Sequence, residues 1–467
     1  MNNAPAAAAL MFSLLAAPAA AAPGDAEQAR AILMKGVGYD TVLGRGKVPA
    51  YAAYLKSVLV AGGFADSDVA IEPVGETANL HLVWQGKGKA APIALAGHMD
   101  VVEADPKDWV RNPFVAVEDG GFIFGRGVGD NKFDVSMIVA TLVALKSAGF
   151  APSRDVHLFL SGDEETAGVT ADLQAKQAKA AGVALLLNSD GGGGEIEKDS
   201  KADTACTAGK AVNYTLSAAE KTYADYTLTV TNPGGHSSRP TVPNALGQLA
   251  AATVKIDGYR FTPQLNEITR EALADAGRKM GGKVGAALLA FVANPADATA
   301  IAVLRAEPAL IGQIGTTCVP TQVSGGHAPN ALPQKGVLTV NCRIFPGVTV
   351  ESVRAELERV VADPAVVVKT GQEWVSTPAS PLRPDVMAAV TKAVAAAHPG
   401  VKAVPGMEAG ASDSVYYRAL GIPSYGVSGL FMRGEDVFIH GLNERIPVAA
   451  IAPALVHWRT LITELAK

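Results

Sequence analysis

The stretch Pro92-Ile93-Ala94-Leu95-Ala96-Gly97-His98-Met99-Asp100 joins an apolar run to two polar side chains. The apolar run predicts a buried strand, and His98 and Asp100 stand two residues apart at its end. If the strand continues, both side chains leave it on the same face. This arrangement is typical of a metal-binding imidazole whose second nitrogen is held by a carboxylate. A single histidine at a strand end is more often structural, so the interpretation depends on the rest of the chain.

Acidic residues follow two further predicted strands. The apolar strand at residues 156–160 precedes Asp163-Glu164-Glu165, and the strand at residues 184–187 precedes Asp190. Neighbouring carboxylates can point in different directions, so that one binds a metal while the next faces a water molecule. In α/β sheets such groups collect at the carboxyl ends of the strands. These acids are therefore candidates for the same site as His98.

Two more candidates lie outside strands. Asp130 follows a glycine-rich loop and precedes the predicted helix at residues 134–148, where an aspartate alone is more typical of a helix N-cap. His440 lies just ahead of the last predicted helix. Mixed imidazole and carboxylate ligands favour zinc, with cobalt and manganese as alternatives. Two such ions, about 4 Å apart, can share a bridging carboxylate and a bridging water.

The pattern of predicted elements indicates an α/β fold with a mixed sheet covered on both faces. Near residue 222 the sequence pattern changes. Apolar and polar residues alternate there, which predicts half-exposed strands. A strand-helix-strand-strand-helix-strand order follows, which is typical of a ferredoxin-like unit. We therefore predict a catalytic domain in two parts, residues 23–220 and 377–467, with an inserted α+β domain at residues 221–376. Within these domains we expect helices at 27–61, 134–148, 170–180, 244–254, 350–361, 385–397 and 448–466, and an irregular, helical segment at 257–308.

Seven motifs, in this order along the chain, resemble those of the co-catalytic zinc aminoacylase/carboxypeptidase family. That family includes glutamate carboxypeptidase, carboxypeptidase S, succinyl-diaminopimelate desuccinylase, acetylornithine deacetylase and aminoacylase. Each motif is weak alone, but together they span nearly the whole chain after residue 22. The motifs are Gly-His-Met-Asp-Val-Val (97–102), Gly-Arg-Gly-Val-Gly-Asp-Asn-Lys (125–132), Asp-Glu-Glu (163–165), Asp190, Gly-Gly-His-Ser-Ser-Arg-Pro (234–240), Cys-Arg-Ile-Phe-Pro-Gly (342–347) and His440.

The resemblance implies a role for each residue of the predicted centre. Two Zn²⁺ ions per subunit are expected, with Co²⁺ or Mn²⁺ as alternatives. Glu164 is implied as the general base, and Asp100 as the residue that orients His98. The implied metal ligands are Asp130 as the bridge, His98 and Asp190 at one ion, and Glu165 and His440 at the other.

The resemblance also implies that the inserted domain is a lid and dimerisation domain of a homodimer. His236 matches a histidine that reaches the partner subunit's active site and contacts the oxyanion. Arg343 matches an arginine that holds the substrate carboxylate, and Asn330 and Gly410 match residues that support the substrate. Phe133 is a departure, because the family usually has glycine there, and we expect it to reshape a pocket wall. The helical segment 257–308 is a second departure.

The composition and the first residues of the chain indicate where the protein acts and which partners it does not bind. Residues 1–22 are rich in alanine and leucine and predict a signal peptide, so we expect an exported protein, periplasmic or secreted. A net charge of -5 argues against nucleic acid as the partner, and no later apolar run is long enough to span a membrane. Cys206, Cys318 and Cys342 do not form a zinc or disulfide pattern, and we interpret them as buried small side chains. The alternative is one bridge in an oxidising compartment, for which Cys318 and Cys342 would have to lie on neighbouring strands.

These observations favour a di-zinc hydrolase that cleaves an amide bond next to a free carboxylate. Export and Arg343 favour a carboxypeptidase acting on small peptides, and a deacylase of N-acyl amino acids is the nearest alternative. A non-catalytic, peptide-binding relative would have lost a ligand or the base, and neither is lost. A metal-free esterase would need a nucleophile, and the chain has no Gly-x-Ser-x-Gly elbow.

Overall fold

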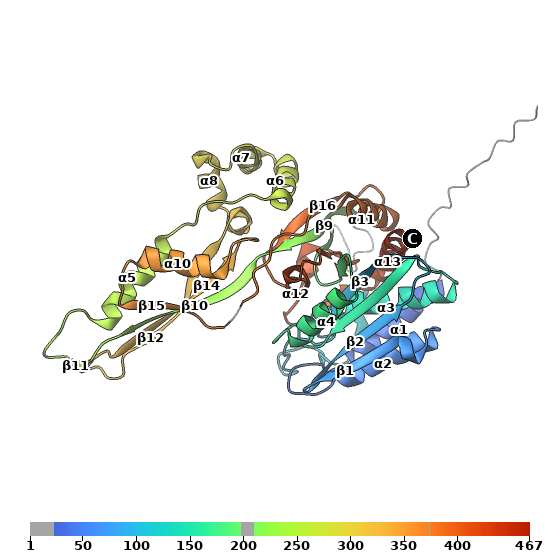
Figure 1. The fold of residues 1–467 in the computed structure, drawn as a ribbon, viewed down its shortest axis with the longest axis horizontal. Coiled ribbons are helices and arrows are strands. Elements are labelled where there is room, and N and C mark those ends of the chain that lie inside the picture. Colours follow the sequence, from blue (N-terminus) through green and yellow to red (C-terminus); the bar gives the residue numbers. More distant parts are fainter. Residues whose placement is uncertain (1–22, 198–209, 373) are drawn as a thin grey trace, which may run out of the picture.

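The computed structural model describes residues 23–197, 210–372 and 374–467. The predicted signal peptide and Cys206 lie outside these residues. Figure 1 shows two parts, a broad α/β domain and an elongated domain that extends away from it. The broad part contains most of the first 220 residues and the last 90 or so, and the elongated part contains the residues between them.

A large mixed sheet forms the centre of the catalytic domain. Its strands β3, β6 and β7 are parallel, so their carboxyl ends lie at one edge. The register pairs His98 with Ser161 and Ala96 with Asn188, which places the loops after the three strands together. In the described residues the sheet has the order β1 (Val69–Val74), β2 (Thr77–Trp84), β6 (Arg154–Ser161), β3 (Ala90–His98), β7 (Leu186–Asn188), β17 (Ser424–Gly426), β9 (Ala211–Glu220), β8 (Gly193–Ile196) and β18 (Phe431–Met432), with β16 (Ala403–Glu408) on β9.

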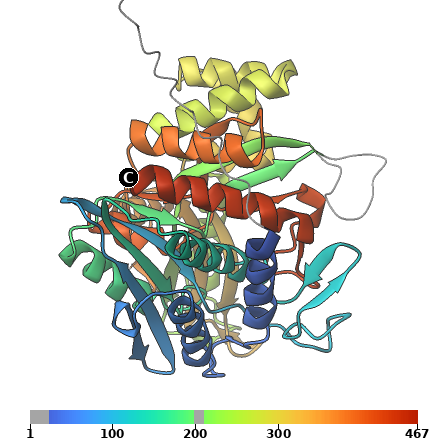
Figure 2. The same ribbon diagram turned by 90° about the vertical axis from the view of Figure 1, so that its right-hand side faces the viewer.

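Helices cover both faces of this sheet, because its central strands are apolar on both sides. Ile93 and Leu95 of β3 belong to the core beneath one helical layer, and Ala94 and Ala96 belong to the core beneath the other. Figure 2 shows the helices of the first layer gathered on one side of the sheet. This layer holds α1 (Pro23–Val37), α2 (Val48–Ala61), α3 (Lys132–Ser147), α11 (Pro384–Ala397) and α13 (Ile451–Leu465), and the second holds α4 (Val169–Ala180) and α12 (Ser414–Ala419). The predicted α/β class with a mixed sheet is confirmed.

Two local features of the catalytic domain differ from the sequence prediction. The single helical pattern at 27–61 is two helices, α1 and α2, separated by a turn in which Gly44 and Gly46 have positive φ. A three-stranded sheet of β4 (Val117–Asp119), β5 (Phe122–Phe124) and β19 (Arg445–Pro447) was not predicted, because its strands are too short to show a pattern. This small sheet joins the segment before Asp130 to the segment after His440.

The inserted domain is built on a second sheet. In the described residues this sheet has the order β12 (Thr317–Gly325), β14 (Lys335–Ile344), β10 (Thr222–Thr231), β15 (Val366–Thr370). The helices α5 (Ala245–Gly258) and α10 (Val350–Val361) pack on it around a separate apolar core. The order along the chain is strand-helix-strand-strand-helix-strand, as expected for a ferredoxin-like unit. A short pair, β11 (Gly235–His236) and β13 (Ala331–Leu332), forms the end farthest from the catalytic domain (Figure 1).

The segment expected to be irregular and helical is an ordered helical unit with its own core. Leu273, Leu288, Phe291 and Leu304 form this core and are at most 3% exposed. Its first helix packs on β16, so the unit links the lid to the catalytic domain. The unit consists of α6 (Glu267–Met280), α7 (Gly282–Ala293), α8 (Ala298–Arg305), α9 (Pro308–Ile311) and the 3-10 turn Gly312–Ile314.

The interpretation of the cysteines as unpaired was wrong for two of them. Cys318 and Cys342 lie directly opposite each other on β12 and β14, with Cα atoms 4.1 Å apart, and form a disulfide. The pairing depends on the register of two strands, which spacing along the chain does not reveal. None of the described helices has both the length and the apolar character needed to cross a bilayer.

Candidate metal centre

The structure brings all five predicted metal ligands to one edge of the large sheet. Ligand atoms of His98, Asp130 and Glu165 lie within 4.8 Å of one another, and so do those of His98, Glu164 and Asp190. The groups come from the ends of β3, β6 and β7, from the loop before α3, and from the loop before β19. Three of these groups therefore follow the carboxyl ends of parallel strands, where functional groups collect in α/β sheets.

The Asp130 carboxylate lies between two imidazoles. Its Oδ1 lies 2.8 Å from Nε2 of His98, and its Oδ2 lies 3.2 Å from Nε2 of His440. The same nitrogen of His440 lies 2.9 Å from Oε1 of Glu165. One oxygen thus faces each histidine, which is the geometry that a bridging carboxylate needs.

Asp100 lies where it can orient His98 and hold the next loop. Nδ1 of His98 is 3.1 Å from the backbone carbonyl of Asp100 and 3.5 Å from its carboxylate. The carboxylate also accepts the backbone N–H groups of Glu164 at 3.1 Å and Glu165 at 3.0 Å. Asp100 therefore fixes the ring on one side and the two glutamates on the other, as partners of metal ligands commonly do.

The three acids after β6 have different surroundings. The Asp163 carboxylate accepts the backbone N–H groups of Val169 and Thr170, both at 2.9 Å, at the start of α4. Asp163 is therefore engaged in structure, where a carboxylate stabilises the helix N-terminus. Glu164 and Glu165 are free to face the cluster.

A buried glutamate that the sequence prediction missed holds the loop of Asp130. Glu444 is 1% exposed and accepts the backbone N–H groups of Gly127 at 3.0 Å, Gly129 at 2.8 Å and Asp130 at 3.2 Å. It also pairs with the guanidinium of Arg126 at 2.8 Å. Its only sequence signal is an acid four residues after His440, in an otherwise polar loop.

Two positions at this loop must be glycine, because neighbouring atoms lie too close for a side chain. A Cβ on Gly97 would meet the Ser189 hydroxyl at 2.5 Å and the Asn131 side-chain oxygen at 2.6 Å. These two groups are hydrogen bonded to each other at 2.7 Å and connect the loops after β7 and before α3. Gly127 has φ of +75°, and a Cβ there would meet Val101 at 2.3 Å. The backbone must therefore pass closely beneath the cluster.

Phe133 does not line a pocket, contrary to our expectation. It is fully buried in the main core, in the first turn of α3. Lys132, just before it, is also buried, and its ammonium donates to the carbonyl of Tyr39 at 2.8 Å. Burial lowers the pKa of Lys132 to about 7. The departure from the family pattern therefore changes core packing rather than the site.

The electrostatics of the cluster fit a site for divalent cations. Burial, and then the neighbouring carboxylates, raise the pKa values of Glu164 and Asp190 well above the ordinary range. Hydrogen bonds to carboxylates raise the pKa of His440 to about 10, and outweigh burial to raise that of His98. The two imidazoles pull the pKa of Asp130 below its usual value against the effect of burial. Negative groups are therefore in excess, and a bound metal would supply the missing positive charge.

A further buried acid, Asp413, stands beside the cluster; the resemblance placed it in a turn at 408–413 that lines the pocket but gave it no role. Its carboxylate accepts the hydroxyl of Ser161, and burial raises its pKa to about 7. It belongs to the loop 409–413 that also contains the predicted substrate residue Gly410. Ser412 of this loop donates to Glu220 at 2.6 Å, and Glu220 pairs with buried Arg418 at 2.8 Å.

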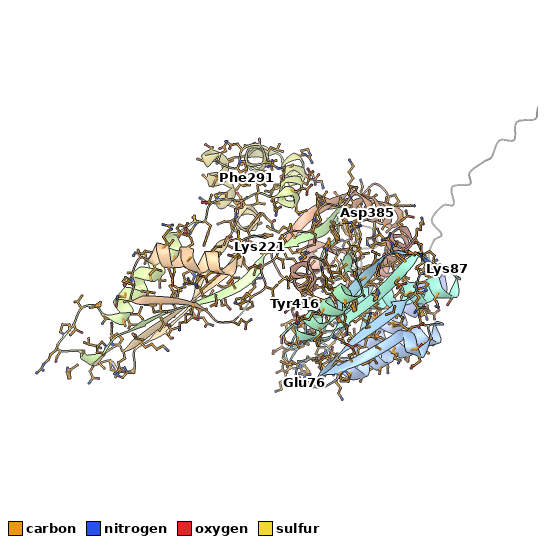
Figure 3. The ribbon with its side chains drawn as sticks, viewed as in Figure 1. Glu76, Lys87, Lys221, Phe291, Asp385 and Tyr416 are labelled. Carbon is orange, nitrogen blue, oxygen red and sulfur yellow. A yellow bond between two sulfur atoms is a disulfide. The ribbon has the colours of Figure 1, made fainter. Side chains whose placement is uncertain are left out.

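A cavity of about 660 Å³ opens beside the cluster, between the catalytic domain and the lid. Glu164, Glu165 and His440 line it from one side, and Tyr223 and Trp374 line it from the other. A neighbouring cavity of about 240 Å³ continues past Glu164 to Asp413 and Tyr416. Figure 3 places Tyr416 at the edge of the catalytic domain that faces the lid.

The structure brings Arg343 and the Gly410 loop together at this junction. The Arg343 guanidinium packs on the ring of Tyr223 at 4.7 Å and donates to the carbonyl of Ala409 at 3.3 Å. Gly410 follows directly and is exposed. Two of the three predicted substrate residues, Arg343 and Gly410, thus lie at the junction where Tyr223 lines the cavity.

His236 and Asn330 are not brought to the metal cluster of their own chain. They lie on the exposed β11 and beside β13, where the backbone N–H of Ser237 donates to the carbonyl of Asn330 at 3.0 Å. This pair of strands is at the far end of the lid (Figure 1). His236 therefore lies far from the metal cluster of its own chain.

A family model and several known proteins match this chain. The model described as Peptidase family M20/M25/M40 matches residues 94–464. N-fatty-acyl-amino acid synthase/hydrolase PM20D1.1 of Danio rerio is 28% identical over 394 residues, covering 82% of this chain and 74% of the relative. Probable carboxypeptidase S-like 2 of Dictyostelium discoideum is 26% identical over 385 residues, covering 79% and 72%.

A solved structure with a similar fold is an M20 family metallo-carboxypeptidase from Sulfolobus solfataricus. Its TM-score is 0.68 at 17% identity, and the match covers 93% of this chain and 98% of that one. Human carnosine dipeptidase 1 has a TM-score of 0.62 at 14% identity, with 94% and 97% covered. At these identities the likeness shows the shared fold.

The role of Glu444 predicts a defect in metal binding without loss of any ligand. Replacing Glu444→Gln removes the charge that holds the loop of Asp130, so metal affinity should fall by about 10- to 100-fold. Titration of the metal-free protein with zinc measures this. Glu464→Gln, which removes a surface ion pair with Lys392, is the matched control. Unchanged affinity in Glu444→Gln would show that the loop holds its shape without that carboxylate.

The raised pKa values predict that metal binding releases protons. At neutral pH the metal-free site holds protons on His98 and His440, whose pKa values are raised, and metal binding requires their neutral forms. Filling the site should release at least two protons at pH 7, because Asp190, whose pKa is also raised, adds to the two imidazoles, and the apparent affinity should rise with pH. Calorimetry in buffers of different ionisation enthalpy counts the protons. His440→Ala should reduce the number by about one, and no dependence on the buffer would contradict the assignment.

Proposed function

The chain belongs to Peptidase family M20/M25/M40, a family of metallopeptidases, and we propose that it is a di-zinc carboxypeptidase. The proposed reaction releases an amino acid from the carboxyl end of a small peptide. The observation that carries the proposal is Asp130 held between two imidazoles, with Glu164 facing the adjoining cavity. The solved relative from Sulfolobus solfataricus, described as a metallo-carboxypeptidase, supports it.

The proposed zinc ligands divide into two sets that share Asp130. His98 and Asp190 would hold one ion, and Glu165 and His440 the other. Imidazole and carboxylate together suit zinc, with cobalt or manganese as alternatives. When bound, the two ions would polarise the scissile carbonyl and lower the pKa of a water molecule.

Glu164 is the proposed general base. Its neighbour Glu165 is turned to His440, while Glu164 faces the cavity and carries a raised pKa. A carboxylate with a raised pKa can accept a proton from the attacking water and then donate it to the leaving nitrogen. Asp100 positions this residue through the Glu164 backbone N–H.

Arg343 is the proposed anchor of the substrate carboxylate. Its guanidinium packs over the ring of Tyr223, and one of its nitrogens contacts the Ala409 carbonyl. The remaining donors suit a carboxylate, with which guanidinium pairs in two parallel bonds. Gly410 and Asn330 are proposed to support the substrate backbone.

We also propose that the enzyme works as an exported homodimer. The exposed His236 at the far end of the lid would contact the oxyanion in the partner subunit, and Asn330 lies beside it. Residues 1–22 would act as a signal peptide that directs the protein to the periplasm or the exterior.

Hydrolysis of N-acyl amino acids is a second candidate, and a specific observation favours it. A cavity of about 730 Å³ adjoins Asp130 and Asp190, and its mixed wall includes the apolar side chains of Met407, Leu430 and Met432 beside glycines and polar residues. An acyl chain could lie in such a space while its amide reaches the cluster. Relatives named N-fatty-acyl-amino acid synthase/hydrolase cover 82% of this chain.

Replacing the base should stop turnover while the metals remain. Glu164→Gln keeps the size of the side chain but cannot accept the proton, so kcat should fall by about 10²- to 10⁴-fold. Elemental analysis of the same preparation should show the wild-type metal content. Retained activity would remove Glu164 from the role of base.

A substrate panel with an Arg343 variant tests the proposed function. Arg343→Ala should lower kcat/KM about 10- to 100-fold on peptides or N-acyl amino acids with a free carboxylate. The same substrates with an amidated end should be poor for both proteins and change less than threefold between them, roughly the scatter of a surface substitution. Arg354→Ala, a surface change on α10 of the same domain, is the control. Equal losses on both substrate classes would reject the role of Arg343.

The dimer proposal predicts complementation between two inactive variants. A heterodimer of His236→Ala and Glu164→Ala chains has one site with an intact Glu164 and an intact His236 from its partner. Refolding the two chains together in equal amounts should restore about a quarter of wild-type activity. Mixing without subunit exchange should restore none. Failure of the co-refolded sample would place His236 outside the reaction.

A further inference from the structure

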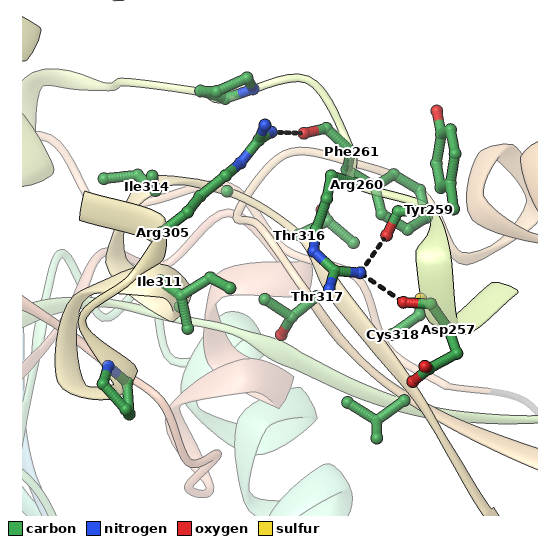
Figure 4. Close-up of a pocket in the computed structure, with 15 residues that line it drawn as sticks. Asp257, Tyr259, Arg260, Phe261, Arg305, Ile311, Ile314, Thr316, Thr317 and Cys318 are labelled. Atoms are coloured by element: carbon green, nitrogen blue, oxygen red, sulfur yellow. Dashed lines mark hydrogen bonds between the residues drawn. The ribbon is translucent and has the colours of Figure 1, made fainter. Parts of the chain in front are cut away.

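A further pocket lies in the lid, away from all the metal ligands. We call it the lid pocket, and its volume is about 360 Å³, within the range of small-molecule sites. Figure 4 shows it between the segment 257–263, the end of the helical unit and the start of β12. Cys318 contributes to the wall, so the disulfide with Cys342 fixes this side of the pocket to the sheet.

Most of the wall is apolar. The rings and branched side chains that line it come from three separate segments rather than from one element. They are Phe261, Pro263, Pro308, Ile311, Ile314 and Val319. An apolar wall of this kind suits a hydrocarbon chain, for which removal from water is the main driving force.

Two arginines line this pocket from different segments. In Figure 4 Arg305 extends from the helical unit to the backbone of Phe261, whereas Arg260 belongs to the segment 257–263 and folds back on it. Arg305 donates to the carbonyl of Phe261 at 2.8 Å, and Arg260 donates to the carbonyls of Asp257 and Tyr259. Neither arginine has an ion pair with a carboxylate among the residues that the structure describes.

Both arginines keep donors that an anion can occupy. Each guanidinium has five N–H donors, and the hydrogen bonds to backbone carbonyls engage one nitrogen of each. A third cation, Lys221, lies behind the wall, with its ammonium 3.5 Å from the hydroxyl of Thr317, which lines the pocket. Asp257 is the one acid in the lining, so positive charge is in excess.

We propose that the lid pocket binds an amphiphilic monocarboxylate, with its head on Arg260 and Arg305 and its chain on the apolar wall. Guanidinium and carboxylate have matching geometry, which selects this head group over a neutral one. A fatty acid and an N-acyl amino acid share this chemistry. The pocket is independent of the metal centre, because none of its lining residues belongs to the cluster or to the cavities beside it.

Calorimetry on the zinc-loaded full-length protein tests the proposal. Decanoate, kept below its micelle concentration, should bind, and decanamide, which has the same chain without the charge, should bind at least tenfold more weakly. Acetate should give no measurable binding. N-decanoylglycine, compared with decanoate on the Arg260→Gln protein in a Glu164→Gln background that blocks turnover, identifies which source of the carboxylate depends on the lid pocket. Equal binding of decanoate and decanamide would overturn the proposal.

Variants locate the site. Arg260→Gln and Arg305→Gln should each weaken decanoate binding at least tenfold. Arg270→Gln is the matched control, because Arg270 lies in the same helical unit and also donates to a backbone carbonyl, that of Val292, but does not line the pocket. Turnover of a small dipeptide should be unchanged in all three, which shows that they are folded. Wild-type affinity in both pocket variants would overturn the proposal.

Photolabelling separates the lid pocket from the metal centre. A decanoate with a diazirine at the end of its chain should label peptides covering 257–263 or 305–319, as read by mass spectrometry. Ile311→Trp, which fills the pocket without changing its charge, should abolish that labelling. Labelling confined to peptides that contain Glu164 or His440 would mean that the fatty acid binds only at the metal centre, and the proposal would fail.

Discussion

The contact of Asp130 with two imidazoles is the interaction on which the rest of the site depends. One carboxylate oxygen lies 2.8 Å from His98 and the other lies 3.2 Å from His440. Several carboxylates are buried around this point, and burial of like charges is costly unless opposite charge is close. Protonated imidazoles meet that need in the metal-free protein, and divalent cations meet it more fully. The residues of the cluster thus indicate a metal site by themselves, without reference to any related protein.

The scaffold holds this cluster by fixing loops rather than individual side chains. Parallel pairing of β3 with β6 and β7 sets three loops side by side. Asp100 then ties the loop after β6 to the loop after β3, and Glu444 ties the loop of Asp130 to the segment after His440. Each tie joins segments far apart in sequence. A catalytic centre requires rigid support of this kind, because small displacements of its ligands strongly lower the reaction rate.

The sequence predicted what depends on strand ends and failed where the answer depends on register or loop packing. His98, Glu165 and Asp190 follow strong apolar strands, so their meeting could be inferred from the geometry of a parallel sheet. The Cys318–Cys342 disulfide required the register of β12 on β14, and Glu444 required the path of a glycine-rich loop. Phe133 was assigned to a pocket wall by resemblance, yet it packs in the core because α3 is buried on nearly all sides.

The two domains must cooperate because the proposed substrate contacts lie on both. Arg343 belongs to the lid sheet, whereas Glu164 belongs to the catalytic domain, and only their junction can hold a carboxylate and an amide together. That junction is built around a buried ion pair, Arg418 with Glu220, at the point where the chain passes into the lid. Arg418 also donates to Ser380, on the segment by which the chain returns. The Arg418 guanidinium thus holds both segments that connect the two domains. The angle between the domains, and with it the position of Arg343, is therefore set inside the catalytic domain.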